Sequence, residues 1–573
     1  MFQTKTQSRK ENKAMNKKNQ DNTTPDEFAF PKAWTLFGPV GKDESEPEFA
    51  GMNAIPNELA IAGKKLAAQK AAFADDNRLD LGALLGGKEV GKTAYLLANV
   101  EVARDTEVEL GAGADWWMKW WINGEVVCDT LQDGNGSWEP PSPLDHRFAA
   151  RLRAGKNVVA VKAVSGMASF VLVAGGPKEM APEQDRVSAL WRGIQSRAEN
   201  MKARIASGEL PDGLIYKADQ DLAKVKERFA AFWQGEIVDR VCLAVTAPNG
   251  PRVPLPGSAV KSDEQAHTDP EFRVHCCNAH FANTWYGGDA LPMAWAPGQL
   301  LYAAYGGKAS FGGGTVWVDP TLTDGQQWAD YRFDPANPFI EHVVRITRAL
   351  AADAPGKYLA ASPGIFGPTD GMSLIRGMCD FLMELALPEY EAPLRHACRE
   401  CLAGYGDIVE AVYRAAGGHG GWFANMPCLW APGRINNWSA DWIYSIGPRQ
   451  FEQWVLPEMQ ALSRLLEYSL YHLDGFNAVV HLPRMLEIPE LTGLQFTPGA
   501  GHTLAEALPV YKQIQQGGKM QWICCAPDEV ELLLRELDPR GLIIMTQTPD
   551  IESAKVLLKK AETWSCRRHR GHG

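Results

Sequence analysis

The chain has 573 residues, of which 45% are hydrophobic and 22% are charged, and its formal net charge is −11. This composition is typical of a soluble globular protein, and the length predicts two or three domains because a single core rarely grows beyond about 300 residues. The acidic balance argues against a nucleic-acid or anionic-membrane partner, which would need clustered Lys and Arg. No apolar run approaches the roughly 20 residues that cross a bilayer, so we expect no membrane partner.

Residues 1–27 are polar and basic and lack the apolar centre of a secretory signal. We predict a disordered lead-in here, with Met15 as an alternative start. The eleven cysteines are scattered along the chain, and two pairs of them are adjacent. This usage favours free thiols in a reducing, cytoplasmic environment over a disulfide framework.

Residues 28–178 alternate short apolar runs with turns rich in Gly, Asn and Asp, which predicts an antiparallel β-sandwich. The dipeptide Asn123-Gly124 lies between two apolar runs and predicts a hairpin. Strand alternation must send some of the tryptophans before this turn into the core, whereas the others could stack on a sugar face or cover a domain interface. The clustered residues are Trp116, Trp117, Trp120 and Trp121.

Residues 179–236 change to helical spacing and predict a helical connector. Residues 237–573 then alternate apolar runs with amphipathic segments of helix length, which favours an α/β fold with a (β/α)8 barrel. The eight predicted strands lie in "VCLAVTA", "ALPMAW", "KYLAASPG", "GWFANMPCL", "YSLYHLDG", "GLQFTPG", "MQWICC" and "GLIIMTQT".

Polar side chains gather where these predicted strands end, which is where such a barrel carries its chemistry. His472 and Asp474 are two residues apart on one strand and therefore share a face. We predict them as catalytic residues, together with Asp289, whose neighbouring glycines allow close approach of a ligand. The residues predicted to bind a small-molecule substrate are Trp285, Asp370, Arg376, Trp430, Asp441 and Gln495.

Several of these residues also have a structural interpretation. Asp289 could be a turn residue, and Arg376 could pair with Asp370 on a helix surface instead of clamping an anionic substrate. Asp474 could orient His472 through a hydrogen bond, or accept backbone N–H groups of the segment that follows it. Residues 275–280, "HCCNAH", match no familiar metal-binding spacing, and we expect surface loop residues there.

Two parts of the sequence resemble known families. "RFAAFWQGEIVDR", "GGDALPMAW", "TDGMSLIRG", "YHLDG", "LQFTPGAG" and "LDPRGLIIMTQT" resemble the uroporphyrinogen decarboxylase-like superfamily, and the resemblance spans residues 225–560. It implies a (β/α)8 barrel of the kind found in uroporphyrinogen decarboxylase and in zinc-dependent methyltransferases that move methyl groups between corrinoid proteins and thiols. "GADWWMKWWINGE" followed by "LRAGKNVVAVKAV" resembles the galactose-binding-like jelly-roll modules of carbohydrate-active enzymes.

The methyltransferases of this superfamily bind zinc through His-x-Cys at a strand end and through a later cysteine. The matching stretch here is His472-Leu473-Asp474, so a carboxylate replaces the first thiolate, and Cys524 and Cys525 lie where the later cysteine is expected. One prediction is therefore a zinc site of His472, Asp474 and Cys525 with one open position. The other is a metal-free acid/base pair of His472 and Asp474.

Three functions remain open from the sequence. The leading hypothesis is an enzyme that acts on a small molecule by methyl or related group transfer, with a corrinoid protein as a candidate partner. The second is decarboxylation of a carboxylated, tetrapyrrole-like substrate, although Arg240 and Arg252 are the only arginines near the start of the predicted barrel. The third is a carbohydrate-related protein in which the Trp-rich sandwich binds a glycan.

Overall fold

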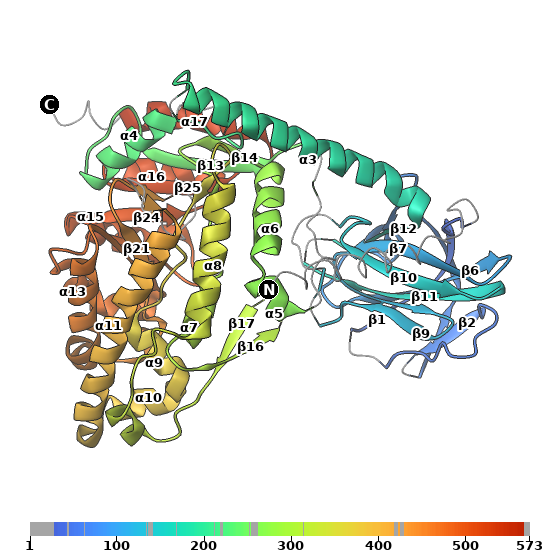
Figure 1. Ribbon diagram of the computed structural model, residues 1–573, viewed down its shortest axis with the longest axis horizontal. Helices are drawn as coiled ribbons and strands as arrows, with labels where there is room; N and C mark the ends of the chain where they lie inside the picture. The colour runs from blue at the N-terminus through green and yellow to red at the C-terminus, as the bar shows by residue number, and fades with distance from the viewer. Residues whose placement is uncertain are drawn as a thin grey trace, which may run out of the picture. The chain divides into compact units, whose positions relative to one another are not determined.

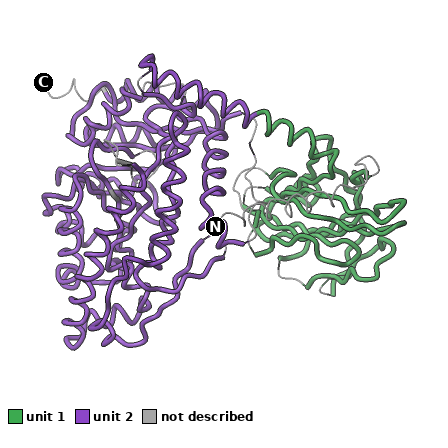
Figure 2. The backbone as a smooth tube through the Cα atoms, in the orientation of Figure 1, with its two compact units in different colours: residues 1–189, 256–258 green, residues 190–255, 259–573 purple. Residues whose placement is uncertain are grey.

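The computed structural model divides into two compact units, residues 1–189 with 256–258 and residues 190–255 with 259–573 (Figure 2). The division falls within one long helix, α3 (Pro177–Ala206). The predicted lead-in, residues 1–27, lies outside the described residues. The structure describes residues 28–42, 45–61, 63–132, 134–135, 141–167, 169–210, 212–217, 222–250, 253, 262–312, 315–417, 422–423 and 429–566.

Antiparallel sheets form the first unit (Figure 1). One sheet has the strand order β4-β1-β6-β11-β8-β9, a second has the order β10-β7-β12-β5, and β2 pairs with β3. The elements are β1 (Ala33–Val40), β2 (Glu58–Ile61), β3 (Lys64–Ala67), β4 (Gln69–Ala72), β5 (Arg78–Asp80), α2 (Leu81–Leu84), β6 (Thr93–Val102), β7 (Thr106–Ala114), β8 (Trp116–Ile122), β9 (Glu125–Asp129), β10 (His146–Leu152), β11 (Gly155–Ser165) and β12 (Val171–Gly175).

Strand alternation gives the six-stranded sheet a hydrophobic core on each face. Trp120 and its neighbours pack in the core shared with the four-stranded sheet, whereas Trp121 packs in a smaller core on the opposite face. Trp117 is half-buried, and the ammonium of Lys42 lies 3.7 Å from the centre of its ring. Two of the four clustered tryptophans therefore fill cores, as their alternation predicts.

The predicted hairpin is confirmed. β8 and β9 are joined by Asn123 and Gly124, whose φ angles of 51° and 85° are the positive values that a two-residue type I′ turn requires.

A mixed seven-stranded sheet forms the centre of the second unit (Figure 1). Its order is β14-β13-β25-β24-β23-β22-β21; all neighbours are parallel except β14, which is antiparallel to β13. β15 and β18 form a separate parallel pair. The strands of this unit are β13 (Cys242–Pro248), β14 (Thr284–Gly288), β15 (Met293–Ala294), β16 (Lys308–Gly312), β17 (Thr315–Asp319), β18 (Leu359–Ala360), β19 (Trp422–Phe423), β20 (Trp430–Ala431), β21 (Ile435–Trp438), β22 (Tyr468–Asp474), β23 (Gly493–Thr497), β24 (Met520–Cys524) and β25 (Leu542–Gln547).

Each of the eight segments predicted as strands of this unit contains a described strand. In "GWFANMPCL" the strand is β19, which pairs with β20 in an antiparallel ladder and is not part of the seven-stranded sheet; residues 421 and 424–428 lie outside the described residues. The parallel strand beside β22 is β21, "INNW". Its two asparagines have low β propensity, which explains why the sequence pattern did not reveal it.

Helices pack against the strands of the second unit and share one large hydrophobic core with them. Within the described part of the chain, no helix combines the length and the apolar character that a membrane crossing needs. "HCCNAH" lies in α6, so the prediction of loop residues there is wrong. The helices are α4 (Leu222–Trp233), α5 (Asp263–Thr268), α6 (Pro270–Asn283), α7 (Leu300–Ala303), α8 (Pro338–Asp353), α9 (Pro368–Arg376), α10 (Met378–Glu384), α11 (Glu391–Ala415), α12 (Pro448–Gln450), α13 (Leu456–Leu465), α14 (Leu482–Leu486), α15 (Leu504–Gln516), α16 (Val530–Glu536) and α17 (Ile551–Cys566), with a π-helical turn at Phe451–Val455.

Candidate functional site

The carboxyl ends of the parallel strands form one edge of the seven-stranded sheet. Trp438 of β21 is in register with Tyr471 of β22, and Asp474 of β22 is in register with Thr497 of β23. Asp441 follows β21 three residues after Trp438, so it lies at the same edge as His472 and Asp474. The structure thus places these three predicted residues at one edge.

His472 is oriented by its neighbour on the next strand. Its Nδ1 forms a hydrogen bond with Oε1 of Gln495, whose Nε2 donates to Oγ1 of Thr497 at 2.8 Å. An amide oxygen can only accept, so Nδ1 carries the proton and Nε2 of the neutral imidazole carries a lone pair. His472 is half-buried. Its free nitrogen has the electronic form that a general base needs.

Asp474 neither orients His472 nor caps the segment that follows it. Nδ1 of His472 is bonded to Gln495 instead, and the 3₁₀ segment Phe476–His481 has no side-chain cap. Asp474 is exposed at the end of β22, before Gly475 turns the chain with a φ of 75°. Its carboxylate is therefore available to a ligand at this edge.

A second polar group at the carboxyl ends contains Asp370, Asp441 and Tyr302. Asp370 is only 4% exposed, and its Oδ1 accepts a hydrogen bond from the backbone N–H of Asp441 at 3.1 Å. Burial raises the pKa of Asp370 well above its ordinary value, and the charge of Asp441 acts in the same direction. The site thus combines a buried carboxyl that favours its proton-bearing form with an exposed carboxylate, an arrangement that separates acid and base roles.

Tyr302 was not predicted from the sequence. Its hydroxyl is hydrogen-bonded to Asp370, and its ring stacks on Phe366 with 3.8 Å between the ring centres. Burial is the main cause that raises the pKa of Tyr302, so the phenol keeps its proton. The signal that could have revealed it is its place on α7, in the segment that follows β15.

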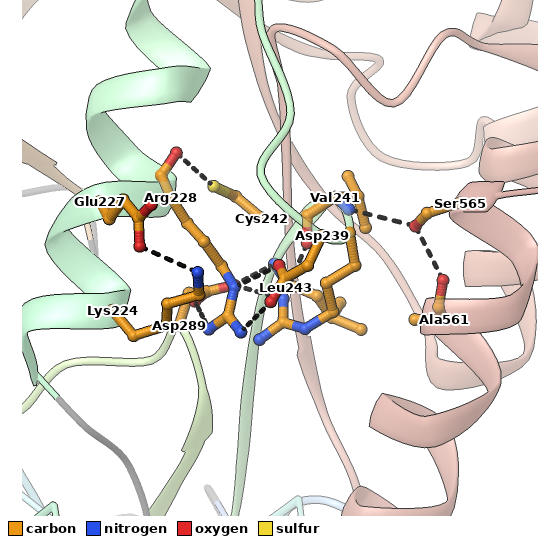
Figure 3. Close-up of polar contacts among 11 residues, drawn as sticks. Lys224, Glu227, Arg228, Asp239, Val241, Cys242, Leu243, Asp289, Ala561 and Ser565 are labelled. Carbon is orange, nitrogen blue, oxygen red and sulfur yellow. Dashed lines mark hydrogen bonds and ion pairs between the residues drawn. The ribbon is translucent and has the colours of Figure 1, made fainter. Parts of the chain in front are cut away.

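Asp289 lies beside the amino end of β13, where both of its carboxylate oxygens accept hydrogen bonds (Figure 3). Its Oδ2 accepts from Nη1 of Arg240 at 2.5 Å and from the backbone N–H of Leu243 at 2.9 Å, and Oδ1 accepts from Nη1 of Arg228 at 3.2 Å. Leu243 is near the amino end of β13, and Asp289 is 0% exposed. The expectation that Asp289 joins the catalytic group is not met, because β14 runs antiparallel to β13 and ends at the amino edge.

Two further predicted residues are held in structural contacts. Nη1 of Arg376 donates to Asp380 and its Nε donates to Glu384, both at 2.7 Å, so Arg376 pairs with neither Asp370 nor an open site. Trp430 is buried before the amino end of β21, where its carbonyl accepts from Nε1 of Trp233 at 2.8 Å.

Trp285 lies near the carboxyl ends of the strands, where the site is predicted. It is half-buried on β14 and is in register with Ala247, close to the carboxyl end of β13. Of the two tryptophans expected to contact substrate, Trp285 alone is placed near the carboxyl ends of the strands.

The predicted zinc ligands do not fit a metal site. Among the described residues, which include His472, Asp474 and Cys525, no three His, Cys, Asp or Glu side chains form a group that could hold a metal ion. Cys525 follows β24, with its backbone N–H donating to the carbonyl of Met545 at 3.1 Å. We therefore derive no chemical step through zinc.

No protein-family profile and no curated protein matches the sequence. Among solved structures, a methyltransferase from Methanosarcina mazei is similar to 59% of this chain and 98% of its own, with a TM-score of 0.42 and 14% identity. An α-xylosidase from Xanthomonas citri covers 92% of this chain and 54% of its own at a TM-score of 0.19 and 11% identity. A β-glucosidase from Kluyveromyces marxianus is similar to 30% of this chain and 16% of its own, with a TM-score of 0.15 and 13% identity.

Proposed function

We propose that the second unit is an enzyme of the uroporphyrinogen decarboxylase-like type that transfers a methyl or related small group to a nucleophile, with His472 as the general base. The observation that carries the proposal is the hydrogen bond from Nδ1 of His472 to Gln495, which leaves Nε2 free at the carboxyl edge. The sequence segments that resemble the superfamily support the assignment of the fold.

The order of the strands agrees with a (β/α)8 barrel. In chain order, the eight strands would be β13, β15, β18 and β21 through β25, with helices or helical turns between successive strands. Enzymes with this fold carry their sites at the carboxyl ends of the strands. The groups around His472 and Asp370 lie at such ends, whereas Asp289 does not.

The proposed reaction uses the chain's own side chains. Nε2 of His472 takes a proton from a bound nucleophile such as a thiol, because a thiolate is the reactive form. The sulfur then attacks the methyl carbon of the donor; a sulfur–carbon bond forms, the bond from carbon to the donor breaks, and its electron pair stays on the donor. Tyr302 donates its hydroxyl proton to Asp370, and the proton-bearing Asp370 can in turn donate a hydrogen bond that positions a polar group of the donor. Asp441 and Asp474 present exposed carboxylates.

Neither Arg240 nor Arg376 supports the decarboxylase alternative, and Arg252 lies outside the described residues. Docking of substrate carboxylates would need free guanidinium groups, but Arg240 is buried against Asp289, and Arg376 is paired with Asp380 and Glu384. A glycan site on the tryptophan cluster is also disfavoured, because Trp120 and Trp121 are buried and the ring of Trp117 is covered by Lys42.

The test is transfer of a methyl group from methylcobalamin to a panel of small thiols, and the loss of methylcobalamin absorbance measures the rate. We expect turnover by the full chain and a loss of about 10²- to 10⁴-fold in the His472→Gln variant, since this is the usual contribution of a general base. His342→Gln is a matched control, because His342 is also half-buried but lies on α8. Absence of turnover with every thiol, or equal rates for both variants, would overturn the proposal.

A further inference from the structure

A cavity lies among the helices of the second unit. Its volume is about 180 Å³, and the polar residues that line it include Thr369, Arg395, Arg399, Gln453 and Glu458. Because liquid water occupies about 30 Å³ per molecule, this space corresponds to about six waters, enough for an inorganic anion or a small organic acid. None of these residues belongs to the candidate catalytic group, although Thr369 precedes Asp370 in the chain.

Two arginines bring positive charge to the cavity from α11. Arg395 and Arg399 are four residues apart and therefore lie on one face of the helix. Nη2 of Arg395 lies 2.9 Å from Oε1 of Glu391, and its guanidinium lies 5.0 Å from the ring centre of Trp454. Arg399 is exposed and makes no hydrogen bond or ion pair with any residue that the structure describes. An unpaired guanidinium beside a cavity is suited to bind an oxyanion through two N–H groups.

A π-helical turn, Phe451–Val455, also contributes to the lining through Gln453 and Trp454. The backbone N–H of Leu456 donates to the carbonyl of Phe451, five residues back, and Pro457 has no N–H for the carbonyl of Gln453. The side-chain amide of Gln453 has no hydrogen-bond partner in the described part of the chain, so its donors are available to a ligand. Such turns occur frequently at functional sites.

Glu458 is the buried carboxyl that lines the cavity. It is 8% exposed, and its Oε2 accepts a hydrogen bond from the backbone N–H of Thr369 at 2.8 Å. Burial raises the pKa of Glu458 to about 7. A protonated Glu458 can donate to an anion, whereas its ionised form repels one. The other titratable groups near this carboxyl are Asp370, Tyr305, Tyr471, Cys398 and Cys401, and Arg395 and Arg399 line the same cavity.

We infer that this cavity binds a small oxyanion, a carboxylate or a phosphate-type group, through Arg399 and Gln453, and that Glu458 takes up a proton when the anion binds. The unpaired guanidinium supplies the charge, and the amide and the protonated carboxyl supply neutral donors. This inference does not depend on the proposed catalytic function.

Calorimetric titration of the full chain with acetate and, separately, with sulfate tests the inference, because neither probe changes its charge between pH 6 and pH 8. We expect saturable binding of at least one probe, weaker by about tenfold at pH 8 than at pH 6, as one proton linked to a group with a pKa of about 7 requires. The probe that binds more tightly identifies the class of anion.

Three variants separate the site from non-specific attraction. Arg399→Ala is expected to weaken binding by tenfold or more, and Glu458→Gln to remove the dependence on pH. Arg414→Ala is the matched control, because Arg414 lies on the same helix with a side chain that is 77% exposed, and it is expected to bind like the unmodified protein. No saturable binding of either probe, unchanged affinity in Arg399→Ala, or equal affinity of the unmodified protein at both pH values would overturn the inference.

Discussion

Replacement of Glu458 by Gln should change how the stability of the second unit depends on pH. Glutamine keeps the shape of the side chain and an oxygen that can accept from Thr369, but it cannot ionise. Burial raises the pKa of the Glu458 carboxyl from 4.5 to about 7. Because the folded-state pKa is the higher one, the stability that this group contributes is fully present below about pH 4.5 and is lost as the pH rises through 7.

The size of this loss follows from the two pKa values. One pKa unit corresponds to about 1.4 kcal/mol, so ionisation of Glu458 costs the folded state about 3 kcal/mol at pH 8 relative to pH 4. The Glu458→Gln variant does not bear this cost. Its free energy of opening should therefore fall less between pH 5 and pH 8 than that of the unmodified protein, by about 2 to 3 kcal/mol.

Hydrogen exchange of peptides that cover α13, corrected for the intrinsic pH dependence of exchange, measures this difference within the second unit. Glu452→Gln is the control, because Glu452 is exposed in the adjoining π-helical turn and paired with Arg484. If the unmodified protein and Glu458→Gln lose the same stability between the two pH values, the account of a buried, proton-bearing carboxyl is wrong.

Three further outcomes are expected. Asp289→Ala should destabilise the second unit by about 3–5 kcal/mol, because it leaves Arg228 and Arg240 with a broken buried pair, while the turnover per folded molecule is unchanged; urea unfolding and the methyl-transfer assay check both parts. Gln495→Leu should lower kcat about fivefold, as loss of a hydrogen bond worth about 1 kcal/mol implies, and a rate equal to that of the unmodified protein would contradict the orienting role of Gln495. Metal analysis of the purified protein should give the same zinc content before and after His472→Gln, whereas stoichiometric zinc that disappears in the variant would restore the zinc prediction.

The sequence revealed the strands whose apolar runs are long or rich in β-branched residues. β13, β22 and β25 have this character, and the period of two correctly placed His472 and Asp474 near the carboxyl end of one strand. β21 was missed because its buried positions, Ile435 and Trp438, are separated by two asparagines. β21 is a strand because it pairs with β22, and this long-range contact is not encoded in the local composition.

The assignment of site residues failed where strand direction mattered. "TWYGGDALP" has the pattern of a strand that ends in a polar group, but β14 runs antiparallel to its neighbour, and this reversal carries Asp289 to the amino edge. Gln495 was predicted because it lies in an apolar run that predicts a strand, and the structure places it beside His472. Tyr302 was not predicted, because the sequence does not show that α7 brings it to Asp370.

The tautomer of His472 tests the central claim most directly. Long-range ¹H–¹⁵N spectra of the imidazoles, with the His472 signals identified by their absence in His472→Gln, report which ring nitrogen carries the proton. We predict a protonated Nδ1 and an unprotonated Nε2 at neutral imidazole, with a pattern that changes in Gln495→Leu. A protonated Nε2, or signals that are insensitive to Gln495, would contradict a general base held at the carboxyl edge by its neighbouring strand.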